Sequence, residues 1–227
     1  MIMVHSDNQG LVLPPFVANT QFVIIPIFGK DDDEAKITGK AHELAGQLKK
    51  AGLRVAVDDS NKKPGYKFNQ WELKGTPVRL ELGVKDFAKE EVRVAIRHNN
   101  EKFQAKWDSL GEEMASLLTK IHKDMYQKAL KAREDNTATV DNWDDFMTEL
   151  NKKKFVLADW CDNVACEKHI KEKSKEESKA LMEAMNEEES ALTGAAKTLC
   201  IPYTMGRQAS GKKDAFKGKK CFCGCNK

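Results

Sequence analysis

A strand–helix–strand pattern within residues 22–57 limits the fold more than any other feature of this sequence. Residues 22–28, Phe-Val-Ile-Ile-Pro-Ile-Phe, form an apolar run that is typical of a strand buried on both faces. A helix that ends at Gly52 is predicted next, with an apolar face formed by Ile37, Ala41, Leu44, Ala45 and Leu48. Residues 53–57, Leu-Arg-Val-Ala-Val, predict a second strand. Two strands joined by a helix form a βαβ unit, so we expect a parallel pair with a right-handed crossover.

The rest of the first 132 residues predicts more strands and a long helix. Residues 77–83, which alternate inward and outward, and residues 91–97 predict two further strands. The polar stretch 58–75 receives no predicted helix or strand. We predict a single helix from residue 103 to about residue 131, because apolar side chains recur there at steps of three and four. This stripe, which is more typical of core packing than of a binding groove, comprises Phe103, Trp107, Leu110, Met114, Leu117, Ile121 and Met125. Residues 1–132 therefore look like a compact α/β domain with a mixed sheet.

The second unit, residues 140–227, follows a polar segment, 133–139, that we interpret as a linker. The apolar side chains of a short predicted helix are Trp143, Phe146, Met147 and Leu150. A strand at 155–158, a charged helix at 168–189 and a second strand at 198–202 complete the pattern. Because this unit has few large apolar residues for its size, it should need an additional stabilising device.

Two close pairs of cysteines supply such a device. Cys161 and Cys166 have the spacing C-x4-C, and Cys221 and Cys223 have the spacing C-x-C, with 54 residues between the pairs. The N-terminus lacks a signal-peptide pattern, so we expect a reducing compartment, in which cysteines are thiols or metal ligands rather than disulfides. The two pairs then predict a tetrahedral zinc ion held by Cys161, Cys166, Cys221 and Cys223. Four protein ligands leave no position for water, so this zinc would be structural.

Other assignments of these residues stay open. On spacing alone, the cysteines are also compatible with unrelated free thiols, and His169 and Cys225 compete as ligands. His169 lies in the charged helix and is more typical of a surface residue. Cys200, between two apolar neighbours, is typical of a small buried hydrophobic residue.

Composition and charge exclude some classes of protein but select none. No segment reaches the ~18 consecutive apolar residues of a membrane-spanning helix. Residues 151–227 contain 16 Lys and Arg against 11 Asp and Glu, whereas the whole chain has a net charge of only +3. A mildly basic C-terminal part fits contact with a polyanion, but an ordinary solvated lysine-rich surface explains it equally well. We expect a cytoplasmic protein that contacts no membrane.

One long segment is similar to a known family. Residues 65–83, Gly-Tyr-Lys-Phe-Asn-Gln-Trp-Glu-Leu-Lys-Gly-Thr-Pro-Val-Arg-Leu-Glu-Leu-Gly, resemble the anticodon-domain signature of prolyl-tRNA synthetases. Residues 7–15 resemble the end of the catalytic domain of these enzymes. The segments 160–167, 197–202 and 221–224 resemble the zinc domain of the eukaryote/archaeal-type members.

The resemblance implies an order of domains. Residues 1–18 would be the end of the class II catalytic domain, and residues 19–132 a class IIa anticodon-binding α/β domain with a mixed sheet. Residues 133–139 would be the linker, and residues 140–227 a small α/β zinc-binding domain. The four cysteines of the two pairs would hold its zinc ion.

It also implies which residues read the tRNA. Proline codons begin with CC, so tRNA(Pro) presents guanines at the second and third anticodon positions. A carboxylate accepts hydrogen bonds from guanine N1–H and the N2 amine, while Arg or Lys donates to O6 and N7. Six side chains match the family signature or its surroundings, namely Phe68, Glu72, Lys74, Arg79, Asp86 and Arg97. The aromatic ring would stack on or support a splayed base, and the two carboxylates would read guanine. Arg79 would donate to a base or orient another group, and Lys74 and Arg97 are weaker candidates.

The parent enzyme would use ATP to attach proline to tRNA through prolyl-adenylate. The arginines with which class II synthetases grip ATP lie upstream of this sequence, so we expect this chain alone to bind neither ATP nor proline and to lack ligase activity. The parent is expected to form a homodimer through its catalytic domain. Ser6 stands where the family usually has glycine, and the family's tail continues beyond the second cysteine pair, whereas this sequence ends at Lys227.

Two other functions stay open. A free-standing RNA-binding accessory protein, built on a synthetase-like anticodon domain, would carry the same residues, and class II motifs in the upstream reading frame would exclude it. A zinc-stabilised protein-interaction module would use the helix at 168–189 as its docking face, although solvation explains that charged helix more simply.

Overall fold

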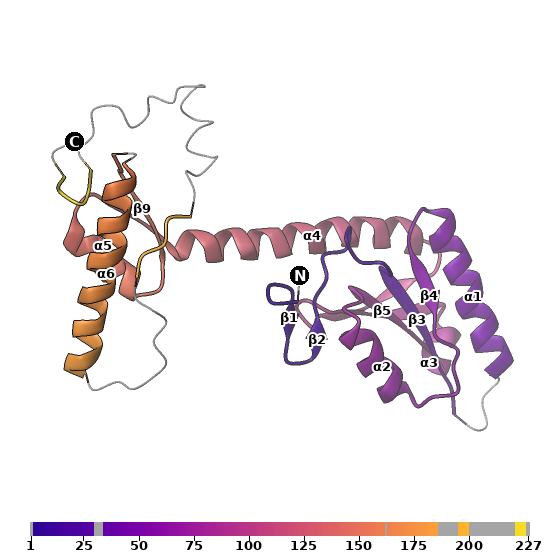
Figure 1. Cartoon of the computed structure of the whole chain (residues 1–227). Coiled ribbons are helices and arrows are strands. Elements are labelled where there is room, and N and C mark those ends of the chain that lie inside the picture. The colour runs from indigo at the N-terminus through magenta and orange to yellow at the C-terminus, as the bar shows by residue number, and fades with distance from the viewer. Residues whose placement is uncertain (1, 30–33, 162, 186–194, 200–220, 226–227) are drawn as a thin grey trace. The chain divides into compact units, whose positions relative to one another are not determined.

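The computed structural model divides the chain into two compact units, Met1–Ala129 and Leu130–Lys227. The residues that the structure describes are 2–29, 34–161, 163–185, 195–199 and 221–225 (Figure 1). Within those residues, no helix combines the length and the apolar character needed to cross a membrane.

The first unit is built on a five-stranded sheet with the strand order β4-β3-β5-β6-β7 (Figure 1). The strands are β3 (Phe22–Ile27), β4 (Val55–Val57), β5 (Val78–Gly83), β6 (Glu91–Ile96) and β7 (Lys102–Lys106). Strand β3 pairs in parallel with both β4 and β5, whereas β6 and β7 are antiparallel to their neighbours. Helix α1 (Glu34–Lys50) joins β3 to β4. The predicted parallel pair with a connecting helix and the predicted mixed sheet are confirmed.

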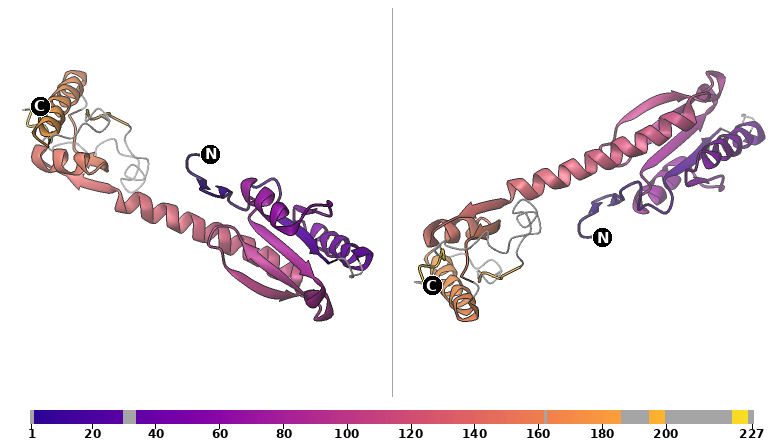
Figure 2. Two further views of the ribbon diagram at one scale, coloured as in Figure 1. Left: turned by 90° about the horizontal axis from the view of Figure 1, so that it is seen from below. Right: turned by 90° about the horizontal axis from the view of Figure 1, so that it is seen from above.

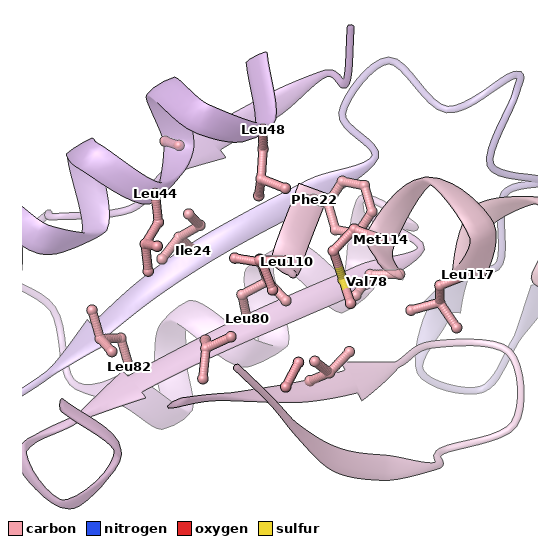
Figure 3. Packing of buried hydrophobic residues seen from close by; sticks show 14 of the residues in the cluster. Phe22, Ile24, Leu44, Leu48, Val78, Leu80, Leu82, Leu110, Met114 and Leu117 are labelled. Atoms are coloured by element: carbon pink, nitrogen blue, oxygen red, sulfur yellow. The ribbon is translucent and has the colours of Figure 1, made fainter. Parts of the chain in front are cut away.

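One face of this sheet is buried against α1 and α4 (Leu110–Asp135) (Figure 3). Alternate strand residues enter this core, among them Phe22 and Leu80, and both are fully buried. They meet Leu44 from α1 and Met114 from α4, which are also fully buried. Each large apolar side chain buried in this way contributes about 1.5–3 kcal/mol, so this core fixes which face of the strands remains for other contacts.

The opposite face of the sheet carries α2 (Pro64–Leu73), which also contacts the hairpin of β1 (Ser6–Asp7) and β2 (Gly10–Leu11) (Figure 2). Pro64 suits the start of a helix because its missing N–H would be unpaired there. The hairpin approaches so closely that a Cβ on Gly10, whose φ is +131°, would lie 2.5 Å from Leu73 Cα. Helix α2 therefore packs against both the hairpin and the sheet.

No helix is predicted for residues 58–75 because α2 lacks an apolar stripe. Its one buried side chain is Lys67, whose ammonium donates to the carbonyl oxygen of Asp58 at 2.9 Å. A helix whose packing depends on a polar contact gives no 3.6-residue hydrophobic period.

The predicted helix from residue 103 is wrong at its start. Residues 102–106 form strand β7, which pairs with β6, and the helix begins only at Leu110. Phe103 is 38% exposed, and Trp107 lies between strand and helix, donating from Nε1 to the carbonyl oxygen of Glu91 at 3.0 Å. The four-residue step between these two aromatic residues continues the helical period by coincidence, while strand pairing determines their backbone.

After the end of α4, the described residues of the second unit form two short parallel strands and two helices. They are β8 (Thr137–Val140), α5 (Trp143–Asn151), β9 (Phe155–Ala158) and α6 (Val164–Met185). The predicted short helix and the strand at 155–158 are confirmed. Residues 133–139, which we interpreted as a linker, form the end of α4 and most of β8.

Two predictions in this unit meet a boundary of the described residues. The charged helix predicted at 168–189 begins earlier, at Val164, and residues 186–189 lie outside the described part. Of the strand predicted at 198–202, residues 198–199 are not in a strand and residues 200–202 lie outside the described part.

Candidate nucleic-acid interface and metal centre

The face of the sheet opposite the main core carries two charged residues of β5, Arg79 and Glu81. They lie two positions apart, so they point to the same side of the strand, away from Leu80. The register places Arg79 opposite Ala95 and Glu81 opposite Arg93 on β6. The next strand continues these rows with Lys102 and Gln104. The exposed side of β5, β6 and β7 is therefore polar and carries both signs of charge.

Arg79 is held by three groups. Its Nη1 donates to Glu72 Oε1 at 2.6 Å, and its Nε donates to Glu81 Oε1 at 3.0 Å. Its guanidinium also lies 4.0 Å from the centroid of the Phe68 ring. The Arg79 side chain is only 11% exposed, whereas that of Glu72 is 31% exposed. The carboxylate of Glu72 is therefore both fixed in direction and accessible from solvent, which is the arrangement that recognition of a planar polar ligand needs.

A cavity of about 340 Å³ opens beside this cluster. Its lining includes Glu72 and Arg79 from the polar face, Lys102 from β7 and Gln9 from the N-terminal hairpin. The cavity therefore presents one carboxylate, that of Glu72, and several hydrogen-bond donors to a bound ligand.

Asp86 lies on a different hollow of about 380 Å³, which Glu81 and Arg93 also line. Its carboxylate accepts from the backbone N–H of Gly83 at 3.2 Å and from Gln104 Nε2 at 3.1 Å. These contacts orient Asp86 from α3 (Val84–Ala88) towards the sheet. Glu72 and Asp86, the two carboxylates predicted to read guanine, thus line two separate hollows. Glu81 connects the two hollows, because it lines the hollow of Asp86 and accepts a hydrogen bond from Arg79, which lines the cavity of Glu72.

Arg97 forms a bidentate ion pair with Asp7 of the N-terminal hairpin. Its Nη1 donates to Asp7 Oδ2 at 2.8 Å, and its Nη2 donates to Asp7 Oδ1 at 2.5 Å. Arg97 is 7% exposed, and its hydrogen bonds lower the pKa of Asp7 to about 2. Arg97 also lines the first cavity, but its terminal nitrogens are engaged by the hairpin, so its arrangement favours a structural role.

Lys74 lies at the exposed end of α2, with its Nζ 4.3 Å from the centroid of the Trp71 ring. Trp71 in turn donates from Nε1 to Asp58 Oδ2 at 2.7 Å. Burial raises the pKa of Asp58, but hydrogen bonds from Ser60 and Trp71 outweigh it, so this pKa lies below its ordinary value. The ionised Asp58 thereby fixes the tryptophan over which Lys74 is placed.

The structure therefore brings three of the six predicted residues together, Phe68, Glu72 and Arg79. Lys74 and Arg97 lie on the flanks of this cluster, and Asp86 lies at the second hollow. Sequence reasoning missed Glu81 and Arg93. The sequence contains a pattern that could have identified Glu81, because it follows Arg79 by two positions in a strand whose other face is apolar.

Five cysteine sulfurs converge in the second unit. Those of Cys161, Cys166, Cys221 and Cys225 all lie within 4.8 Å of one another. Cys223 is not among these four, although its sulfur lies 3.0 Å from that of Cys166. A tetrahedral zinc ion with Zn–S bonds of ~2.3 Å places its sulfurs ~3.8 Å apart, so the cluster has the donor type and the dimensions for that ion.

The surroundings of these thiols differ. Burial is the main cause that raises the pKa of Cys161, Cys166 and Cys221. A hydrogen bond with Cys161 is the main cause that lowers the pKa of Cys225 to about 7. His169 is exposed on α6 and is not part of the sulfur cluster, and Cys200 lies outside the described residues.

Phe222 connects the cysteine cluster to the core of the second unit. Its ring lies 4.7 Å from that of Phe146 and is stacked on Trp143 at 6.1 Å. Trp143 donates from Nε1 to both oxygens of Glu177 on α6, at 3.0 and 2.9 Å. Aromatic packing of Phe222 therefore anchors the start of the segment 221–225 on this core.

Comparison with known proteins accounts for both units. Residues 21–117 match the family model of an anticodon binding domain, and residues 143–227 match the model of the C-terminal domain of prolyl-tRNA synthetase. The chain belongs to the prolyl-tRNA synthetase family. The resemblance noted for residues 65–83 is thus confirmed, together with the α/β fold class.

Relatives in the synthetase family match most of this chain. The cytoplasmic proline–tRNA ligase of Arabidopsis thaliana is 39% identical over 220 residues, which is 96% of this chain and 39% of the relative. A proline–tRNA ligase of Lachnospira eligens is 44% identical over 173 residues, or 76% of this chain and 36% of the relative.

A solved structure is similar as well. The crystal structure of prolyl-tRNA synthetase from Cryptosporidium parvum, complexed with L-proline and AMP, has a TM-score of 0.74 and 40% sequence identity. The match covers 88% of this chain and 40% of that one. This chain therefore spans about two fifths, or less, of the length of these synthetases.

Proposed function

We propose that this chain is the tRNA-selecting and bracing part of a proline–tRNA ligase, and that its first unit reads the anticodon of tRNA(Pro). The observation that carries the proposal is the Glu72–Arg79–Glu81 cluster over Phe68, on a face of the sheet that the main core does not use. The match of residues 21–117 to an anticodon binding domain supports anticodon reading by this unit.

Guanine recognition fits the groups on this face. A carboxylate accepts from guanine N1–H and N2, and an arginine donates to O6 and N7. Each hollow combines these two groups, with Glu72 and Arg79 in the first and Asp86 and Arg93 in the second. We propose that each hollow takes one of the two guanines that a proline anticodon contains.

Phe68 has a supporting role in this proposal, and Arg79 orients Glu72 in addition to donating to guanine. The Phe68 ring backs the Arg79 guanidinium at 4.0 Å, which favours the supporting role over stacking on a base. Arg79 orients Glu72 through the 2.6 Å contact. Lys74 would meet the phosphate backbone, since it lies exposed at the end of α2.

The metal centre of the second unit would be structural. Cys161, Cys166 and Cys221, with a fourth thiolate from the 221–225 segment, would hold zinc. The ion would supply folding free energy and no reaction step, because all four of its positions would be filled by protein.

In the parent enzyme we expect ATP and proline to bind to the catalytic domain, which residues 1–18 would end, and we expect that domain to form the homodimer. The anticodon domain would comprise residues 19–132, with the zinc domain at 140–227. The parent would act in the cytoplasm. The purified 227-residue chain should form no prolyl-adenylate. Pyrophosphate exchange dependent on proline and ATP measures this directly, and exchange above background would contradict the assignment.

A binding titration with anticodon stem-loops tests the proposed reading. Proline-type loops are compared with loops in which each guanine is replaced by adenine, at a fixed salt concentration because phosphate contacts alone produce salt-dependent affinity. A loss of about 1–3 kcal/mol at each replaced guanine is expected. Equal binding to all loops would support a charge-driven RNA-binding accessory protein instead.

A further inference from the structure

The metal centre contains one thiol more than a four-coordinate ion takes. Three cysteines are common to the ligand set predicted from spacing and to the set found by geometry, namely Cys161, Cys166 and Cys221. The fourth position differs, because spacing selects Cys223 and the mutual 4.8 Å limit selects Cys225.

Each candidate for the fourth position lies close to two of the three common sulfurs. The sulfur of Cys225 is 3.4 Å from that of Cys161 and 3.8 Å from that of Cys166. The sulfur of Cys223 is 3.0 Å from that of Cys166 and 3.3 Å from that of Cys221. Ligand sulfurs on a tetrahedral zinc ion lie ~3.8 Å apart, so Cys225 needs little movement, whereas Cys223, which is not in the set within 4.8 Å, would need an adjustment to complete the site.

The backbone between the two candidates permits such an adjustment. They are separated only by Gly224, whose φ of +76° lies in the left-handed region that glycine adopts without strain. A Cβ at Gly224 would meet nothing within 4 Å, so this point of the chain is not packed against other atoms of the described residues. Cys223 and Cys225 are half-buried, whereas Cys166 and Cys221 are buried.

We propose that Cys223 and Cys225 are interchangeable fourth ligands of the metal centre, so that one of them is an unligated thiol beside the bound ion. The proposal rests on the structural zinc of the proposed function but goes beyond it. Cys161, Cys166 and Cys221 form a constant three-thiolate set, and the glycine-linked pair supplies either of two completing ligands. Loss of one of the two leaves a complete four-thiolate site.

Serine variants of the full chain test this exchange. Cys223→Ser and Cys225→Ser are compared with the double variant and with Cys161→Ser, which removes a constant ligand. Each protein is loaded with zinc or with cobalt(II), whose thiolate charge-transfer absorption reports the number of bound sulfurs. Each single variant should retain one ion and the four-thiolate cobalt spectrum. The double variant and Cys161→Ser should lose a thiolate and bind metal at least ~10-fold more weakly. If either single variant behaves like the double variant, the exchange is excluded and only the cysteine lost in that variant is a ligand.

Alkylation of the unmodified sequence provides a second test that does not depend on the folding of variants. Zinc-loaded protein is treated briefly with iodoacetamide, and peptide 221–227 is mapped by fragment-ion mass spectrometry. The label should divide between Cys223 and Cys225 and spare Cys221. Label confined to one of the two would show a fixed ligand set, and label on neither would show that no thiol is left over. A metal-free sample, in which all three cysteines should react, serves as the control.

Discussion

At the scale of single residues, Arg79 organises the proposed reading face. One guanidinium contacts the ring of Phe68 and the carboxylates of Glu72 and Glu81. A bidentate, planar cation is suited to this position, because its donors have fixed directions and its flat face stacks on an aromatic ring. The consequence is that Glu72 is presented in one orientation.

Arg79→Lys keeps the charge but removes this geometry. Lysine has a single ammonium, which cannot hold both carboxylates and stack on Phe68 at the same time. Because Glu81 is 7% exposed, its carboxylate would lose a buried partner. We therefore expect the free energy of unfolding to fall by about 1–3 kcal/mol. Affinity for the proline-type stem-loop should fall by a similar amount.

Urea unfolding and stem-loop titration measure the two effects. Lys89→Arg, at an exposed site after α3, is the matched control and should change neither quantity. An Arg79→Lys protein with unchanged stability and affinity would show that the cluster has no orienting role.

The pair of Asp7 and Arg97 predicts a specific acid dependence. The pKa of Asp7 is lowered from 3.8 to about 2, so the folded state favours the ionised carboxylate. Its contribution to stability is therefore complete above pH ~4 and is lost as the pH falls towards ~2. The effect should be modest because the Asp7 side chain is 47% exposed. Asp7→Asn should lower the urea midpoint at pH 5 and flatten its decline between pH 4 and pH 2. Parallel declines in both proteins would rule out this linkage, and Asp108→Asn, an exposed control, should behave like the unmodified chain.

Single residues of the site were predictable to different degrees. Phe68, Glu72 and Arg79 were predicted only because they match a long family signature. Without that signature, a single carboxylate in a polar segment such as Glu72 has no pattern that distinguishes it from an ordinary surface residue. The separation of Asp86 from Glu72 depends on strand register and on α3, which spacing does not encode. The engagement of Arg97 by Asp7 joins residues 90 positions apart and was not predictable from local sequence.

At the scale of helices and strands, apolar periodicity identified the elements that contribute to the main core. Helix α1 shows this, because all five residues of its predicted apolar face are buried. The sequence did not predict helix α2 because its one buried side chain, Lys67, makes a polar contact and the helix has no apolar stripe. It did not predict strand β7 because this strand is defined by its pairing with β6 at the edge of the sheet. These are the elements that border the proposed reading face, so hydrophobic patterning is least informative where the site is built.

The burial of one face of β5 against α1 and α4 predicts the cost of a core truncation. Leu80 is fully buried in the main core, and Leu80→Ala should destabilise the first unit by about 2–5 kcal/mol through lost burial and a residual cavity. Leu73→Ala, at a leucine of α2 that is 46% exposed, should cost much less. Denaturant unfolding of the two variants checks the difference, and equal losses would contradict the assignment of the core.

At the scale of the whole molecule, the two units are stabilised by different means. Among the residues that the structure describes, the core of the first unit has nineteen buried residues, whereas that of the second has seven, of which two are cysteines of the sulfur cluster. Removal of the metal should therefore loosen the second unit and leave the first intact.

Hydrogen exchange with and without a chelator measures this difference. Amides of β8, β9, α5 and α6 should lose protection when the metal is removed, while those of β3, β5 and β6 should keep it. An equal loss of amide protection in both units, or no loss of protection in either unit, would contradict a structural metal confined to the second unit.

We propose that carboxylates of this chain read the anticodon guanines of tRNA(Pro). A double-mutant cycle measures this contact, with Glu72→Gln as the protein change and inosine, which lacks the N2 amine of guanine, as the RNA change. In the unmodified protein, inosine at one of the two guanine positions should cost about 1–3 kcal/mol of stem-loop binding at fixed salt. In Glu72→Gln that cost should largely disappear at the same position and persist at the other, where Asp86→Asn should have the matching effect. If inosine costs the same in all three proteins at both positions, these carboxylates do not read guanine.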